Sequence, residues 1–282
     1  MKRKKTLQEL TIKDNFMFGA VMCDEKHCSR FLEMALGFPI AKVEVSKEKS
    51  IVYHPQYKGV RLDVYAKDEN NTHYNVEMQT VKQEALFKRA RYYHSQIDME
   101  LLLSGAEYSE LSNAYVIFVC DFDPFECGKY RYTITNRCQE LNNKAIDDGN
   151  TTIFLSTRGT NQEEVPESLV KFLEFVKADL KESGGDFEDD FVKSLQDSVA
   201  SIKKSREMGD RFMILSAMLQ DERREGKVEG KAEDIISFLE DLTTVSQELQ
   251  EKIMSETDLS TLKRWLKLAA KAESIEQFMN EM

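Results

Sequence analysis

The chain has 282 residues, of which 41% are hydrophobic and 32% charged, enough for one substantial core and a small accessory module. No apolar run approaches the ~20 residues that a membrane-spanning helix needs, so we expect no membrane partner. The basic N-terminus lacks a following apolar stretch, and the five cysteines include no Cys-x-x-Cys motif. Both observations favour a reduced, cytoplasmic protein.

The net charge of −11 argues at face value against a nucleic-acid partner. The charge is unevenly distributed, however. Residues 1–160 carry 22 basic and 22 acidic side chains, whereas residues 161–282 carry 17 and 28. Because the first part is neutral, local basic patches there could still hold phosphate groups.

The first predicted helical region runs from Thr11 to Leu36, as one or two helices with a break near Asp24. Asp14 could cap or begin this region, and Gly37 ends it. The following segment, Lys42 to His54, favours one or two strands because β-branched and aromatic residues recur in it.

Residues 60–80 predict a β-hairpin. Apolar and polar residues alternate in both arms, and residues 67–72 between them are rich in turn formers. If the turn centres on Asn70, residues whose numbers sum to 140 face each other. Asp63 then lies opposite Glu77, on the polar face of the hairpin.

Two directly opposed carboxylates have Cβ atoms ~4.5–5.5 Å apart and must share a proton or a cation. Mg²⁺ prefers oxygen ligands, so the pair predicts a metal site, and Gln79 lies on the same face. The alternative is a solvated hairpin in which the two acidic residues face each other without a function. A slip of one residue in the turn would move Asp63 to the other face.

The clearest helix of the first half runs from Val81 to Ser104. Its apolar residues recur at spacings of three and four, as Leu86, Ala90, Tyr93, Ile97 and Leu101. This helix follows the Glu77 strand almost directly, so its first half should lie near the carboxylates. Lys88 and Arg91 could then neutralise a phosphate, and Gln96 could orient a water. The alternative is a solvated polar face.

Three further strands are predicted at residues 113–120, 130–135 and 152–155, and the first is apolar enough to be buried on both faces. From Pro166 the chain is predicted to be helical, with a long helix over residues 187–219. Residues 221–234 are almost all charged or glycine and favour a solvated helical or flexible linker. Residues 235–282 predict a small helical bundle with Trp265 in its core.

These patterns predict three parts: residues 1–182, a helical extension and charged linker over residues 183–234, and the bundle of residues 235–282. Strands flanked by helices on either side indicate an α/β core.

Asp63, Glu77-x-Gln79 and a helix carrying Arg91-Tyr92-Tyr93 resemble the PD-(D/E)xK nuclease superfamily. The helix at residues 13–18 and the charged glycine stretch at residues 225–231 make the chain similar to the Rpn family of recombination-promoting nucleases and transposases. The resemblance covers about residues 10–235. It implies an α/β, restriction-endonuclease-like core, a mixed sheet flanked by helices, followed by a helical C-terminal region.

The resemblance implies an endonuclease that hydrolyses DNA with Mg²⁺ or Mn²⁺, in recombination, mobile elements or phage defence. Asp63, Glu77 and Gln79 would be catalytic, and the carboxylates and the backbone carbonyl of Met78 would hold the metal. Accessory candidates are Asp14, Glu33, Lys88, Arg91 and Gln96. A homodimer is a further expectation, because a double-strand cut needs two sites.

Gln79 stands where the wider superfamily has lysine, although Glu-x-Gln is normal in the Rpn branch. A neutral amide cannot act as a base and could only hold a water by hydrogen bonding. The alternative function is therefore a nuclease-fold protein without turnover, which serves as a nucleic-acid-binding or protein-interaction module.

Overall fold

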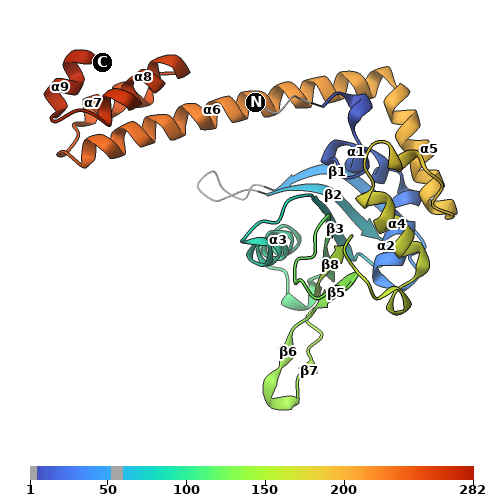
Figure 1. The fold of residues 1–282 in the computed structure, drawn as a ribbon. Coiled ribbons are helices and arrows are strands. Elements are labelled where there is room, and N and C mark those ends of the chain that lie inside the picture. Colours follow the sequence, from blue (N-terminus) through green and yellow to red (C-terminus); the bar gives the residue numbers. More distant parts are fainter. Residues whose placement is uncertain (1–4, 52–59) are drawn as a thin grey trace. The chain divides into compact units, whose positions relative to one another are not determined.

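The computed structural model describes residues 5–51 and 60–282 (Figure 1), so the end of the predicted strand region at residues 52–54 lies outside the described residues. The chain divides into two compact units, residues 1–208 and 209–282. The predicted boundaries at residues 182 and 234 stay predictions. In the described ranges, no helix combines the length and the apolar composition needed to cross a membrane.

The first unit begins with a 3-10 turn at Leu7–Glu9 and two helices, α1 (Asn15–Met22) and α2 (Glu25–Leu36). The predicted break between the helices is confirmed. Asp24 caps α2 by accepting the backbone N–H groups of Lys26 and His27. The helix ends at Gly37, whose φ of 84° lies in the left-handed region that glycine adopts without strain.

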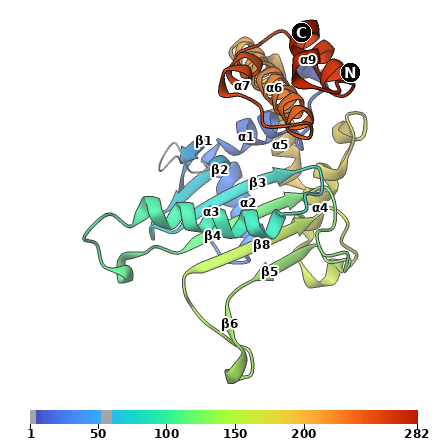
Figure 2. The ribbon, with the colours of Figure 1, turned by 90° about the vertical axis from the view of Figure 1, so that its left-hand side faces the viewer.

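Among the described residues, six strands form one mixed sheet in the order β1-β2-β3-β4-β8-β5 (Figure 2). The antiparallel strands β1, β2 and β3 come first, β3, β4 and β8 are parallel, and β5 is antiparallel to β8. Their bounds are β1 Val43–Ile51, β2 Val60–Asp68, β3 His73–Gln79, β4 Ala114–Cys120, β5 Arg131–Ile134 and β8 Asn150–Ser156. A small hairpin of β6 (Arg137–Cys138) and β7 (Lys144–Ala145) was not predicted.

Helices cover both faces of this sheet, which confirms the predicted fold class (Figures 1 and 2). One face is covered by α3 (Leu86–Leu101), and its apolar stripe packs on Val116 and Phe118 of β4 and Phe154 of β8. The other face carries α1, α2 and α4 (Glu167–Lys177), with α5 (Asp190–Lys204) packed against them. The rings of Phe31 and Phe172, 5.2 Å apart, join α2 to α4.

The predicted helix over residues 187–219 is wrong in one respect, because Ser205 adopts an extended conformation and separates α5 from α6 (Arg206–Glu240). The charged segment of residues 221–234 is helical and lies wholly within α6. The second unit continues with α7 (Gln247–Met254), α8 (Leu259–Ala269) and α9 (Ile275–Glu281). Trp265, only 6% exposed, lies in the core of this unit, as predicted.

The two glycines of residues 221–234 offer a test of whether this segment is helical. At Gly226 and Gly230 an added Cβ meets open space, and each glycine lowers helix stability by about 1 kcal/mol relative to alanine. Gly226→Ala and Gly230→Ala should therefore each increase helical ellipticity and raise the unfolding midpoint of the second unit by several degrees.

Circular dichroism measures both quantities. Gly159→Ala is the opposite control, because its Cβ would overlap the ring and backbone nitrogen of Tyr130 and should destabilise the first unit. Unchanged ellipticity and midpoint in both α6 variants would mean that the segment is a flexible linker.

Candidate functional site

The hairpin of β2 and β3 has the register that the sequence predicts. Val64 pairs with Val76, and the remaining cross-strand pairs also have numbers that sum to 140. Asp68 fixes the turn by accepting the backbone N–H of Asn70 at 2.9 Å, and Asn71 adopts a left-handed φ of 60°. Because the register is fixed by the turn, Asp63 and Glu77 lie opposite each other on the same face.

The backbone pairing of β2 with β3 ends at Val64 and Val76, and side chains continue it. The N–H of Asp63 donates to Oε1 of Glu77 at 3.2 Å, and the N–H of Met78 donates to Oδ2 of Asp63, also at 3.2 Å. Each carboxylate thus binds the opposite strand. Both acidic groups are held in place by the strand geometry.

Helix α3 brings a cation to this pair. Nη2 of Arg89 lies 2.6 Å from Oε2 of Glu77, and Nη1 donates to Oε1 of Gln79 at 3.1 Å. The hydroxyl of Tyr93 donates to the same Glu77 oxygen at 3.3 Å. One guanidinium therefore bridges the two side chains of the Glu-x-Gln motif.

The β3 part of the polar face is buried and Asp63 on β2 is partly buried, so this face is not fully solvated as the alternative supposed. All seven residues of β3 are buried, and the side chain of Glu77 has no exposed surface, whereas that of Arg89 is 28% exposed. Burial, and then the charge of Asp63, raise the pKa of Glu77, while Arg89 opposes them. The buried carboxylate is stable here because it is paired and hydrogen-bonded.

The carbonyl of Met78 lies on the same side as these groups. In a strand, the N–H and C=O of one residue point to the same neighbouring strand, and the N–H of Met78 points to Asp63. The carbonyl of Gln79 points the other way and accepts the N–H of Asp121 at 2.9 Å. This orientation supports the predicted use of the Met78 carbonyl as a metal ligand.

The donor set fits a hard divalent cation. It offers two carboxylates, one backbone carbonyl and one side-chain amide, and Mg²⁺ commonly binds one or two carboxylates with water and substrate oxygens in the remaining positions. Within residues 5–51 and 60–282, no group of three or more His, Cys, Asp and Glu side chains forms a richer metal site. A metal at Asp63 and Glu77 would therefore depend on water and substrate for its other ligands.

The two accessory candidates on the N-terminal helices have other partners. Asp14 binds Nζ of Lys5 at 2.7 Å and accepts the N–H of Thr11 at 2.8 Å. Glu33 accepts the N–H of Ile40 at 3.1 Å, after the end of α2. The neighbouring residue Asn15 contacts the site instead, since its Nδ2 donates to Oδ2 of Asp63 at 3.1 Å.

The accessory candidates on α3 do not make the contact with Glu77 that Arg89 makes. Lys88 and Arg91 are exposed, and Gln96 is buried with Nε2 4.0 Å from Sδ of Met99. Arg89 was not among the residues predicted for the site, although it lies four residues before Tyr93, a member of the apolar stripe. That spacing places both side chains on the side of α3 that faces β3.

Residues 13–212 match a family model described as PD-(D/E)XK nuclease family transposase. No curated protein and no solved structure matches the chain. The matched range begins just before α1 and ends within α6, so it includes the whole mixed sheet and every residue of the site described above.

The pairing of Glu77 with Arg89 predicts a pH-dependent loss of stability in Arg89→Met. Without its cation, the buried carboxyl has a pKa raised further above its value in the unfolded chain. A group of this kind contributes stability to the fold that is fully present below its pKa in the unfolded chain. That contribution is lost as pH rises through its pKa in the folded protein. The pKa of Glu77 is already raised to about 8 with Arg89 in place, so the variant should lose little stability near pH 5 and about 1 kcal/mol more near pH 9 than near pH 5.

Urea unfolding at several pH values measures this loss. Lys88→Met, which removes the neighbouring exposed cation, is the matched control and should show a flat, small effect. Adding Glu77→Gln to Arg89→Met should remove the pH dependence. Equal losses at all pH values in Arg89→Met would contradict a charged Glu77 paired with Arg89.

Proposed function

We propose, because the chain belongs to the PD-(D/E)XK nuclease family transposases, that it hydrolyses phosphodiester bonds of DNA with the help of Mg²⁺ or Mn²⁺. The observation that carries this proposal is the convergence of Asp63, Glu77 and Gln79 at the point where β2 and β3 separate. Oxygen donors from three side chains and one backbone carbonyl meet there, beside the arginine of α3.

Asp63, Glu77 and the carbonyl of Met78 would hold the metal. When bound, the ion would polarise the scissile phosphate and lower the pKa of a bound water. Asn15 and the N–H of Met78 keep the Asp63 carboxylate in its orientation, and Tyr93 does the same for Glu77. These contacts preorganise both acids before substrate binds.

Gln79 would orient the attacking water by hydrogen bonding, since its amide cannot accept a proton for transfer. The positive charge that a lysine would bring is supplied beside it by Arg89, 3.1 Å from its oxygen. Arg89 reaches this position from α3 and can also donate two parallel hydrogen bonds to a phosphate. Lys82, which could also have supplied a charge, is paired with Glu126.

A second candidate is a nuclease-fold protein without turnover that binds nucleic acid or protein. The bridge of Arg89 across Glu77 and Gln79 favours it, since the same oxygens would have to bind the metal. The two candidates differ in whether a divalent ion can take Glu77 from Arg89.

Plasmid cleavage tests the proposal. Purified protein with Mg²⁺ or Mn²⁺ should nick or linearise supercoiled DNA, and EDTA should abolish the reaction. Asp63→Asn and Glu77→Gln should each lower the rate by at least a hundredfold, because each removes a ligand charge. Glu84→Gln, which removes an exposed carboxylate just before α3, should leave the rate unchanged.

Cleavage that survives Glu77→Gln would place the active site elsewhere. Folded protein that never cleaves with either metal would favour the binding module. Linear product formed directly from supercoiled DNA, together with a dimer in solution, would support the expected homodimer, whereas nicked product from a monomer would contradict it.

A further inference from the structure

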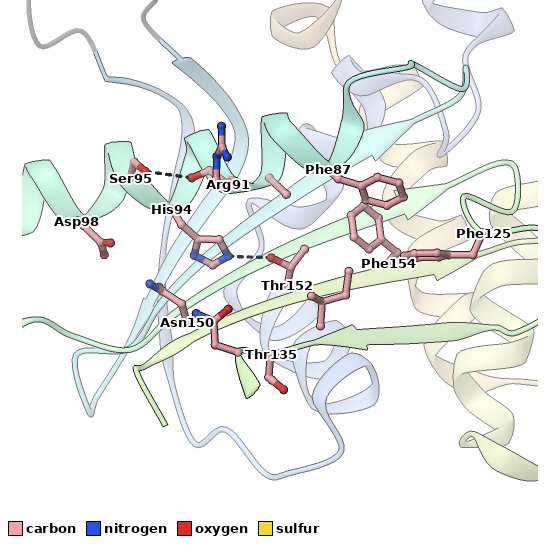
Figure 3. Close-up of a pocket in the computed structure, with 13 residues that line it drawn as sticks. Phe87, Arg91, His94, Ser95, Asp98, Phe125, Thr135, Asn150, Thr152 and Phe154 are labelled. Carbon is pink, nitrogen blue, oxygen red and sulfur yellow. Dashed lines mark hydrogen bonds between the residues drawn. The ribbon is translucent and has the colours of Figure 1, made fainter. Parts of the chain in front are cut away.

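A second concave site lies on the opposite side of α3 from Glu77. A pocket of about 470 Å³ opens between α3, β8 and the end of β5 (Figure 3). At about 100° per residue, His94 and Asp98 lie about 140° and 180° around the helix from Arg89. The pocket is therefore separated from the Glu77 site by the width of one helix.

One end of the pocket is aromatic. The ring of Phe87 lies 5.0 Å from that of Phe125 and 5.4 Å from that of Phe154, measured between centroids. Phe154 is fully buried, whereas Phe87 is 47% exposed at the mouth of the pocket. The cluster thus holds Phe87 in place and leaves ring surface on which a flat ligand can stack.

The other end is polar, with His94 at its centre (Figure 3). This side chain is more than nine-tenths buried, and its Nε2 shares a hydrogen bond of 2.9 Å with Oγ1 of Thr152. Among the described residues, Nδ1 makes no hydrogen bond of normal geometry, and Asn150, which lies beside the ring, interacts with both His94 and Asp98. Burial lowers the pKa of His94 to about 4, so the ring is neutral near pH 7.

These two ends select a class of ligand. A purely apolar ligand would leave Nδ1 of His94 without a hydrogen bond. The cation among the lining residues, Arg91, is exposed, so an anion at the polar end would meet Asp98 instead. A neutral, planar heterocycle with donors and acceptors along one edge satisfies both ends. Its face stacks on Phe87, and its edge bonds to His94 and Asn150. The pocket volume is also in the range of small-ligand sites.

We propose that this pocket binds a nucleobase, with its edge directed to His94 and Asn150 and its face on Phe87. The base comes from the DNA substrate or from a free nucleotide. The first source rests on the proposed nuclease function.

The exposed surface of α3 carries cations that could contact a DNA strand whose base reaches the pocket. Lys88 and Arg91 are exposed, and the guanidinium of Arg91 points away from His94 to the outside of the helix (Figure 3). A strand whose base enters the pocket would pass these two cations with its phosphates. Base stacking and phosphate pairing would thus come from neighbouring turns of one helix.

Binding can be measured without cleavage in full-length Asp63→Asn protein with EDTA, by fluorescence anisotropy of a short single-stranded oligodeoxynucleotide. Phe87→Ala, and separately Ser95→Trp, which fills the pocket from its exposed rim, should each weaken binding at least tenfold. Tyr108→Ala, which removes an aromatic ring that is 84% exposed, is the matched control and should bind like the parent.

Two further probes identify the source of the base. An all-abasic oligomer of the same length should bind the parent at least tenfold more weakly than the base-containing oligomer does. It should bind the parent and Phe87→Ala equally well. This result would assign the pocket to DNA bases. Deoxynucleoside monophosphates that shift the resonances of His94, in the parent but not in Ser95→Trp, would assign it to free nucleotides.

The outcomes separate this inference from the proposed function. If plasmid is cleaved but both pocket variants bind DNA like the parent and no monophosphate shifts His94, the nucleobase pocket is overturned and the nuclease stands. If monophosphates bind but no DNA is cleaved, the pocket stands and the nuclease proposal fails.

Discussion

The contact between Glu77 and Arg89 is the interaction on which the first unit's site depends. A carboxylate without exposed surface is stable in a strand only if a cation or a proton accompanies it. Arg89 provides that cation, and its guanidinium is held in turn by the rings of Tyr93 and Phe118, 5.0 and 6.0 Å from its centre. The same rings stack on each other, so the packing of α3 on β4 and the pairing of charges reinforce one another.

Three elements of the chain each contribute a different kind of group. The hairpin of β2 and β3 presents the acids, α3 presents the cation and a hydroxyl, and α1 presents the amide of Asn15. The acids face each other because a turn fixes their register, whereas the cation depends on the docking of a helix. The helix at the beginning of the matched region thus has a physical reason to accompany the motif, since its Asn15 orients Asp63.

The sequence was most informative where one local pattern determines the geometry. The period of two and the turn at Asn70 predicted the register of Asp63 and Glu77, and the stripe of α3 predicted which face of the helix is buried. The choice of Arg91 as the site cation stays a prediction that the contacts do not favour, because Arg89 makes the ion pair. That choice required the rotation of α3 about its axis, which tertiary packing sets. The break at Ser205 carries neither glycine nor proline, so nothing local indicated it.

The position of β3 in the sheet has a consequence for how the site responds to heat. This strand lies between β2 and β4 with all seven residues buried, and buried central strands are among the slowest parts of a domain to open. The acid that the proposed chemistry needs is therefore among the last groups to loosen. By contrast, Phe87, which is 47% exposed at the rim of the second pocket, lies in the first turn of α3 and is held there by ring contacts with Phe125 and Phe154. The two sides of one helix thus differ in burial, with a buried acid pair on one side and a partly exposed aromatic rim on the other.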